Sequence, residues 1–138
     1  FGGLDQVSEH FSDLFELALK ARENAYVPYL DFKVGASLRC ASGKLYVGCN
    51  YQTASLPLGC CAENVAICQM IANADRDIVE VVVVADSDHI SPCGACRQQL
   101  FEFSTSDTVV HLCNLQGLLT SSTIGELLPL AFKENFME

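Results

Sequence analysis

Two short motifs that can converge on one metal ion constrain this chain more than any other feature. The first is Cys-Ala-Glu at residues 61–63, which opens a helix-like run. The second is Pro-Cys-Gly-Ala-Cys at residues 92–96. Pro92 suits the first position of a helix, where its missing N–H costs nothing. Cys93 and Cys96 are then expected in the first helical turn, with their sulfurs on one face.

These residues match the ligand set of a catalytic zinc ion. Helix N-termini carry partial positive charge, which lowers the pKa of a thiol and favours the thiolate that a metal needs. Three thiolates from Cys61, Cys93 and Cys96 leave one position of a tetrahedral zinc for water, which is typical of a catalytic rather than a structural site. Glu63 is placed to reach that water without binding the metal.

Each part of this pattern has a simpler interpretation when it is taken alone. A C-x-x-C motif is more often a redox pair or half of a structural zinc knuckle. Glu63 is most simply a first-turn acid that complements the helix dipole. The combination of C-x-E with P-C-x-x-C, separated by a crossover-length gap, favours the catalytic zinc instead. Cys60 must point away from Cys61, and we interpret it as a small buried hydrophobe.

Length and composition indicate one domain. The chain has 138 residues, and half of them are apolar. That is enough for a real core, and no linker, repeat or low-complexity tract divides the chain, so we expect a single domain over residues 1–138. No apolar run approaches membrane-spanning length, and the N-terminus lacks the pattern of a signal peptide. We therefore expect no membrane partner.

The net charge and the cysteines indicate which binding partners and which cellular compartment to expect. The formal net charge is −9, which argues against nucleic acid because phosphate neutralisation requires clustered Lys and Arg. A small, uncharged substrate fits better. Three of the eight cysteines belong to the metal motifs, and a reducing cytoplasm is the expected location. Four more lie in apolar runs: Cys40, Cys49, Cys68 and Cys113.

Hydrophobic periodicity predicts an α/β fold. We expect helices at residues 4–26, 62–74, 92–103 and 124–128, the last capped by Thr123 and stopped by Pro129, and strands at 32–40, 45–50, 78–85 and 109–115. The strand at 78–85 contains four consecutive valines and should be buried on both faces. The order predicts a three-layer α/β/α sandwich with a mixed five-stranded sheet, antiparallel at the hairpin and parallel later. Both zinc-bearing helix starts should lie at the carboxyl ends of neighbouring strands.

Three further features bear on packing and binding. Gly35, inside a strand, indicates a close backbone approach or a bulge. The polar residues 50–53 follow the second strand and could bind a substrate hydroxyl, although Asn50 could equally cap a turn. The tail at residues 130–136 is too apolar for a free end, so we expect it to be buried against the domain or a neighbouring subunit.

Over nearly its full length the chain resembles the small homotetrameric zinc-dependent cytidine deaminases. Its motif pair is close to the zinc-deaminase signature, with Cys in the position of the usual His. Other matching blocks point to the nucleoside branch: Pro28-Tyr29, Phe32-x-Val34-Gly35-Ala36, Gly48-Cys49-Asn50, Pro57-Leu58-Gly59 and Glu126-Leu127-Leu128-Pro129-x-x-Phe132. The resemblance implies a cytidine deaminase-like fold and hydrolytic deamination of cytidine or deoxycytidine, with release of ammonia, in pyrimidine salvage.

The resemblance also implies roles for individual residues. Cys61, Cys93 and Cys96 would bind zinc, and Glu63 would move protons during the reaction. The substrate-binding residues would include Asn50 at the ribose, Phe32 and Ala62 near the nucleoside, and Phe132, which would stack on the base in the site of a neighbouring subunit. Without the family, ordinary core packing is the simpler interpretation of both phenylalanines.

Three positions depart from the family pattern. Gln52 stands in place of the ribose-binding acid; it can still accept a hydrogen bond from a hydroxyl but loses the charge-assisted bond. Asn64 replaces the Arg that follows the catalytic Glu, which leaves Asn64 and Arg97 as the candidates to support the zinc ligands. Leu56 replaces a Tyr that reaches the substrate.

Two alternatives follow from these departures. One is a deaminase of another aminopyrimidine nucleoside, such as blasticidin S. The other is a catalytically idle zinc-binding assembly protein, although a structural site would not need Glu63.

Overall fold

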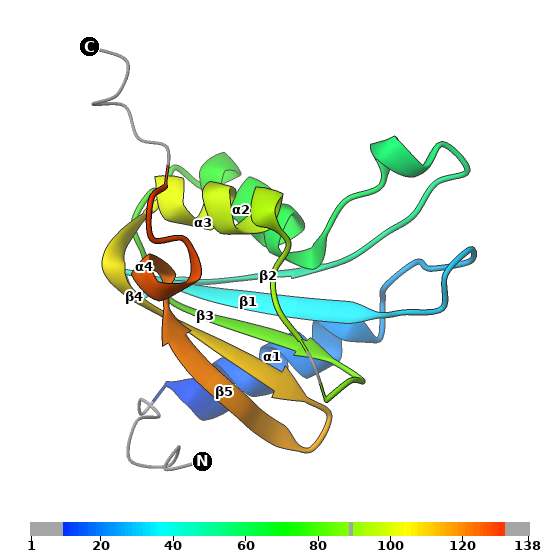
Figure 1. The fold of residues 1–138 in the computed structure, drawn as a ribbon, viewed down its shortest axis with the longest axis horizontal. Coiled ribbons are helices and arrows are strands. Elements are labelled where there is room, and N and C mark those ends of the chain that lie inside the picture. The colour runs from blue at the N-terminus through cyan, green and yellow to red at the C-terminus, as the bar shows by residue number, and fades with distance from the viewer. Residues whose placement is uncertain (1–9, 89, 132–138) are drawn as a thin grey trace.

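One mixed sheet runs through the protein, with helices on both of its faces (Figure 1). The structure is a computed structural model and describes residues 10–88 and 90–131. Its strands are β1 (Val34–Cys40), β2 (Leu45–Cys49), β3 (Ile78–Ala85), β4 (Ser104–Asn114) and β5 (Gly117–Thr123). Its helices are α1 (Phe11–Arg22), α2 (Ala62–Ala72), α3 (Gly94–Glu102) and α4 (Ile124–Leu127), with a short 3-10 turn at Leu56–Leu58. Within the described ranges no helix is long and apolar enough to cross a bilayer.

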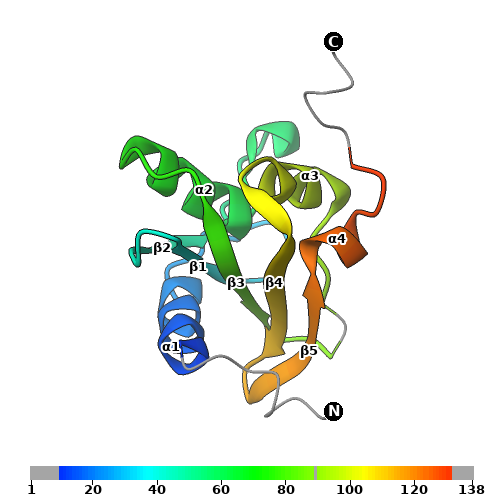
Figure 2. The same ribbon diagram turned by 90° about the vertical axis from the view of Figure 1, so that its left-hand side faces the viewer.

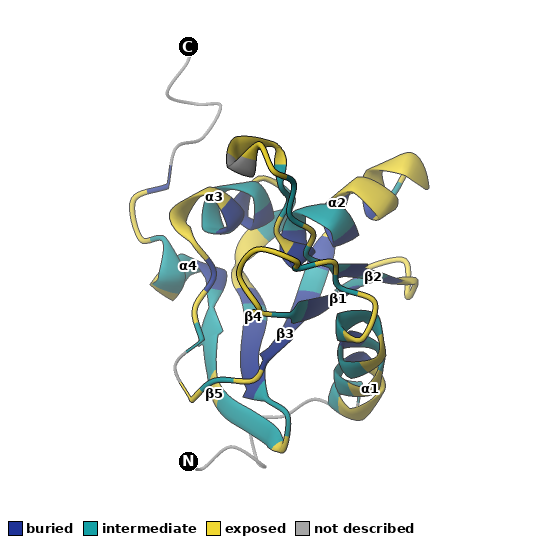
Figure 3. Cartoon of the chain, turned by 90° about the vertical axis from the view of Figure 1, so that its right-hand side faces the viewer, coloured by how far each residue is buried: buried dark blue, intermediate teal, exposed yellow. Residues whose placement is uncertain are grey.

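The helices and the sheet form three layers, as the sequence predicts. Helix α1 covers one face of the sheet, and α2 and α3 cover the other (Figure 2). Strand β3 contributes to both cores: Val81 and Val83 pack on the α2 and α3 side, whereas Val82 and Val84 pack with Leu14 of α1. The prediction that this valine run is buried on both faces is confirmed (Figure 3).

The sheet is mixed, as predicted, but the strands before the two metal motifs are not placed as predicted. In the described residues the order is β2-β1-β3-β4-β5, with β1 antiparallel to both β2 and β3. Strands β3 and β4 are parallel, but β5 returns antiparallel to β4. The crossover through α2 carries the chain from β2 across β1 to the other edge of β1, where β3 pairs. Strands β2 and β3, which lead to the two metal motifs, are therefore separated by β1 and are not neighbours.

Several element boundaries also differ, each for a local reason. Helix α1 ends at Arg22 rather than at residue 26, because the Tyr26 N–H donates to the Asn50 carbonyl at 3.1 Å. The predicted residues 4–9 of this helix lie outside the described part of the chain. Helix α2 ends at Ala72, and Ala74 adopts a left-handed φ of 63°. Strand β4 begins five residues before the prediction, at Ser104, in a polar stretch with no apolar period.

The sequence predicted a five-stranded sheet but gave residue ranges for only four strands, and β5 is the strand without a predicted range. Most of its side chains are half-buried, so its hydrophobic pattern is weak. The turn before it is better marked: the Asn114 side-chain oxygen accepts from the backbone N–H groups of Gln116 and Gly117. This Asx turn, with Gly117 at φ 148°, is the local signal for the reversal.

The cap predicted at Thr123 is confirmed. Its hydroxyl accepts from the Glu126 N–H at 3.2 Å, and the Glu126 carboxylate accepts from the Thr123 N–H at 2.9 Å, which completes a capping box. After α4, Leu130 is 97% exposed in the single chain and Ala131 is buried, so burial of the tail against the domain or a neighbouring subunit stays a prediction. Phe132 and the rest of the tail lie outside the described residues.

A buried polar row crosses the sheet on the face that α1 covers. The Glu80 carboxylate is 3.1 Å from Arg39 Nη2 and 2.7 Å from His111 Nε2. His111 Nδ1 lies 2.7 Å from the Ser121 hydroxyl. The Phe11 ring from α1 packs against the His111 ring in a T-shaped arrangement. Side chains from β1, β3, β4 and β5 are thereby joined in one row.

Gly35 fits the close approach predicted from its place in the strand. A Cβ built on Gly35 of β1 would overlap the Ala18 carbonyl oxygen of α1 and lie 2.9 Å from Arg22 Cβ. The two backbones touch here, so no larger residue fits without moving the helix.

We expect Gly35→Ala to lower the free energy of unfolding by about 1–3 kcal/mol, the usual cost of overpacking. Denaturant unfolding followed by far-UV circular dichroism measures the change. Gly94→Ala is the control, because a Cβ there meets nothing within 4 Å. Equal stability of Gly35→Ala and the wild type would contradict the backbone contact.

Candidate metal and catalytic site

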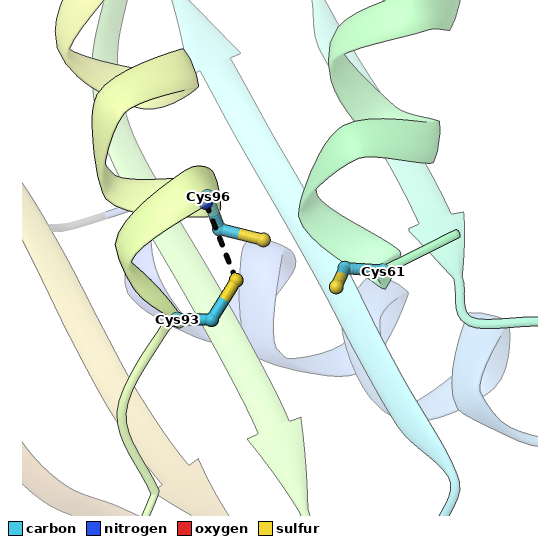
Figure 4. Close-up of side chains that lie close together, drawn as sticks. All are labelled: Cys61, Cys93 and Cys96. Atoms are coloured by element: carbon cyan, nitrogen blue, oxygen red, sulfur yellow. Dashed lines mark hydrogen bonds between the residues drawn. The ribbon is translucent and has the colours of Figure 1, made fainter. Parts of the chain in front are cut away.

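The N-termini of α2 and α3 bring the three cysteines of the two motifs together (Figure 4). Cys61 is the N-cap of α2 and Cys93 is the N-cap of α3, both with extended backbone, and Cys96 lies in the first turn of α3. The three sulfur atoms lie within 4.8 Å of one another. Zn–S bonds of about 2.3 Å in a tetrahedron require sulfurs about 3.8 Å apart, so a small contraction would close the cluster around zinc.

The local geometry corrects one detail of the predicted motif. Helix α3 starts at Gly94, so Pro92 precedes the helix and Cys93 caps it. The Cys93 sulfur accepts from the Cys96 N–H at 3.4 Å, as a capping side chain does. The cap, rather than a shared helical face, sets the position of Cys93 relative to Cys96.

The thiols differ in how readily they ionise. Burial raises the pKa of Cys96 and of Cys61. At Cys93 burial also acts to raise the pKa, but hydrogen bonds from the Cys96 amide and from the neighbouring thiols outweigh it, and the pKa is lowered. The predicted effect of a helix N-terminus thus holds for Cys93 only. A soft donor set whose charge is disfavoured by burial suits a divalent cation, which favours the thiolates on binding.

Glu63 lies beside this cluster in the first turn of α2. Its side chain is buried, and burial raises the pKa of its carboxyl group. Its depth follows from Gly48 on β2, where an added Cβ would overlap the Ala62 carbonyl oxygen and lie 2.6 Å from the Ala66 nitrogen. The start of α2 therefore packs directly against the strand, and this contact keeps Glu63 buried.

A cavity of about 290 Å³ opens onto the cluster. It is lined by Phe32, Val34, Asn50, Cys61, Ala62, Glu63, Val83, Ala85, Ile90, Ser91, Cys93 and Cys96. The structure therefore brings together the three cysteines, Glu63, Ala62, Asn50 and Phe32 from the sequence-predicted site. The rest of the cavity wall was not predicted from the sequence, although most of these residues lie at or after the ends of strands: Val34, Val83, Ala85, Ile90 and Ser91.

Asn50 joins the cavity to the start of β1. Its Oδ1 accepts from the Val34 N–H at 2.8 Å, and its Nδ2 donates to the Phe32 carbonyl at 2.9 Å. The side chain thus extends the pairing of two strands rather than capping a turn. One Nδ2 hydrogen serves Phe32, and the amide group has a second.

Gln52 is not among the cavity-lining residues in the described chain. Its Oε1 accepts from the Tyr29 N–H at 3.1 Å and from the Leu30 N–H at 3.0 Å. Its Nε2 donates to the Leu30 carbonyl at 2.8 Å. The side chain is occupied by the backbone of the 29–30 loop.

Asn64 and Arg97 also have partners other than the sulfur cluster. The Asn64 amide donates to the Cys60 sulfur at 2.6 Å. Cys60 is therefore a half-buried acceptor, not the buried hydrophobe that we expected. The Arg97 guanidinium binds the carbonyls of Pro92 at 2.9 Å and Leu127 at 2.7 Å, and the Ser91 hydroxyl. Arg97 thus ties the segment before Cys93 to the end of α4.

Comparison with known proteins gives a consistent result. The family described as "Cytidine and deoxycytidylate deaminase zinc-binding region" matches residues 8–112, which include Cys61, Glu63, Cys93 and Cys96. A cytidine deaminase from Halalkalibacterium halodurans is 46% identical over 120 residues, 86% of this chain and 91% of that protein. The crystal structure of cytidine deaminase from Burkholderia pseudomallei superposes with a TM-score of 0.83 at 41% identity, and covers 91% of this chain and 100% of that one.

A more distant relative acts on another compound by name. Blasticidin-S deaminase from Bacillus cereus is 30% identical over 131 residues, 87% of this chain and 92% of that protein.

We expect the purified protein to hold about one zinc per chain through three sulfurs, because the cluster supplies three soft donors. Cys61→Ser should lose most of this zinc, whereas Cys60→Ser, which changes the adjacent thiol outside the cluster, should keep it. Metal analysis gives the stoichiometry and X-ray absorption gives the ligands. Four sulfurs, or a nitrogen in the coordination shell, would contradict the assignment.

Proposed function

The chain belongs to the cytidine and deoxycytidylate deaminase zinc-binding family, and from this premise we propose that it hydrolyses cytidine or deoxycytidine to the uracil nucleoside and ammonia. The single observation that carries the proposal is the buried carboxyl group of Glu63 in the same cavity as the three-sulfur cluster. A zinc site that only stabilised the fold would need neither an open cavity nor this acid.

The residues divide the chemistry between them. Cys61, Cys93 and Cys96 would hold zinc, which when bound supplies a Lewis acid that makes water a stronger acid near neutral pH. Glu63 would take a proton from the attacking water as its oxygen adds to C4 of the cytosine ring. Glu63 would deliver that proton to N3, then take the proton of the new C4 hydroxyl group and pass it to the departing amine, so that the C4–N bond breaks, the C4 carbonyl forms and ammonia leaves.

The other cavity residues would position the nucleoside. Ala62 is fully buried at the start of α2, and Phe32 and Asn50 form the wall toward β1 and β2. We propose that Asn50 meets the ribose and that Phe32 packs beside the nucleoside. None of the described lining residues is Lys or Arg, whereas Glu63 and three thiols are present. This charge balance favours an uncharged nucleoside over a phosphorylated substrate.

We further propose a homotetramer with sites completed between subunits. Large apolar side chains are exposed on the two loops that bracket the Phe32 side of the cavity: Tyr26, Tyr29, Leu30, Phe32, Tyr51 and Leu58. An exposed apolar patch of this kind is typical of a protein interface. Phe132 of a neighbouring subunit would stack on the base. We place the reaction in pyrimidine salvage in the cytoplasm, where the free cysteines would stay reduced.

A second candidate substrate is blasticidin S. The 30% identity to a blasticidin-S deaminase and the changed residues Gln52, Leu56 and Asn64 favour it. The cytidine deaminases are more similar to this chain, so cytidine is the first choice. Ammonia release from cytidine, deoxycytidine, cytosine and blasticidin S separates the two. Zinc binding without turnover of any of them would instead favour an assembly protein.

Glu63→Gln should keep zinc and bind nucleoside but lose turnover by roughly two to four orders of magnitude, the usual contribution of general acid–base catalysis. Steady-state ammonia release measures kcat, and ligand titration measures binding. Glu102→Gln, an exposed acid at the end of α3, is the control and should retain wild-type rates. A Glu63→Gln protein with normal kcat would remove this residue from the mechanism.

Sedimentation should show a tetramer at concentrations where the enzyme is active, because the exposed apolar loops and the proposed role of Phe132 require a neighbour. Phe132→Ala should raise KM more than a change at exposed Leu130. A monomer with full activity would rule out shared sites.

A further inference from the structure

The nine-residue loop from Tyr26 to Val34 is held at both ends by the segment 50–52. At one end the Tyr26 N–H donates to the Asn50 carbonyl, and the Gln52 N–H donates to the Tyr26 carbonyl at 2.9 Å. At the other end the Asn50 N–H donates to the Val34 carbonyl at 3.2 Å, and the Asn50 side chain accepts from the Val34 N–H. The loop leaves this segment and returns to it, and Phe32, which lines the cavity, lies near its second end.

The Gln52 side chain fills the middle of this loop. Its oxygen accepts from the Tyr29 and Leu30 N–H groups, and its nitrogen donates to the Leu30 carbonyl. The Leu30 carbonyl also accepts from the Phe32 N–H at 2.7 Å. The chain therefore turns toward the cavity at Leu30, the residue whose N–H and carbonyl both bind Gln52. The three bonds from Gln52 fix the turn that delivers Phe32 to the wall.

The loop distinguishes an amide from a carboxylate. Two backbone N–H groups face one end of the side chain and a backbone carbonyl faces the other. An amide offers an acceptor and a donor in this arrangement, whereas an ionised carboxylate has acceptors only. A glutamate at residue 52 would place an oxygen against the Leu30 carbonyl, with no hydrogen between them.

We infer that Gln52 is a positioning residue that sets the Phe32 wall of the cavity through the loop, and that it does not bind the substrate itself. This inference replaces the substrate contact that the sequence suggested for Gln52. It rests on the proposed function for its kinetic consequence, but not for its structural one. Losing the amide should loosen the wall that receives the nucleoside and leave the cluster and Glu63 in place.

Two variants test the inference, and Gln69→Met serves as the matched control. The Gln69 side chain also accepts from a backbone N–H, that of Val47 at 3.0 Å, but it lies away from the loop. In the zinc-loaded protein without substrate, Gln52→Met should speed amide hydrogen exchange at Tyr29 and Leu30 roughly tenfold or more, since each lost hydrogen bond removes several-fold protection. Gln69→Met should leave the exchange of these two amides unchanged.

Steady-state kinetics distinguish the two roles, because they predict opposite changes in the KM of Gln52→Glu. If Gln52 positions the loop, Gln52→Glu and Gln52→Met both raise KM severalfold with kcat nearly unchanged, and the rise is equal for cytidine and for its analogue without 2′ and 3′ hydroxyls. If Gln52 instead binds a sugar hydroxyl, Gln52→Glu lowers KM through a charge-assisted bond, and the penalty of Gln52→Met vanishes with the analogue. Either of these two results overturns the inference.

The exchange measurement keeps this inference separate from the proposed function. If the wild-type protein deaminates none of the nucleosides, the proposed function fails, and the exchange rates at Tyr29 and Leu30 still decide whether Gln52 holds the loop. Unchanged exchange in Gln52→Met overturns the inference whatever the activity.

Discussion

The backbone contact between β2 and α2 at Gly48 determines where the chemistry can take place. With no side chain on Gly48, the first turn of α2 lies directly on the strand, and Ala62 is fully buried in the contact. Cys61 and Glu63 flank that residue, so one contact sets the depth of a metal ligand and of the proposed proton carrier together. A methyl group at this point would have to move the whole helix start away from the Cys93 motif.

The second helix start is held by charge and hydrogen bonds rather than by backbone packing. Arg97 grips Ser91 and Pro92 just before Cys93 and reaches Leu127 at the end of α4. Its guanidinium therefore binds the loop before Cys93, and it affects the position of the Cys93 sulfur through that loop. The capping box at Thr123 fixes α4 in turn. The C-terminal part of the chain thus bears on the geometry of the cluster through a short sequence of contacts.

The parts of the site that could be predicted from the sequence are those with a local physical rule. The two cysteine motifs predicted the cluster, the valine run predicted β3, and Thr123 predicted the cap of α4. Where the sequence offers no local rule, tertiary partners determine what a side chain contacts. Gln52 has the chemistry of a sugar ligand, but its amide group is hydrogen-bonded to the backbone of the loop at Tyr29 and Leu30. Asn64 could have met a zinc ligand, but Cys60, which lies just before the N-cap of α2, receives its hydrogen bond.

The buried row of Arg39, Glu80, His111 and Ser121 has a consequence for folding. Each member comes from a different strand, and the complete set of contacts forms only when all four strands are aligned as observed. A shift of one residue in any strand would turn a side chain to the opposite face and leave a carboxylate or a guanidinium buried without its partner. The row therefore raises the free energy of misaligned sheets relative to the observed alignment, so it favours one strand register over the others.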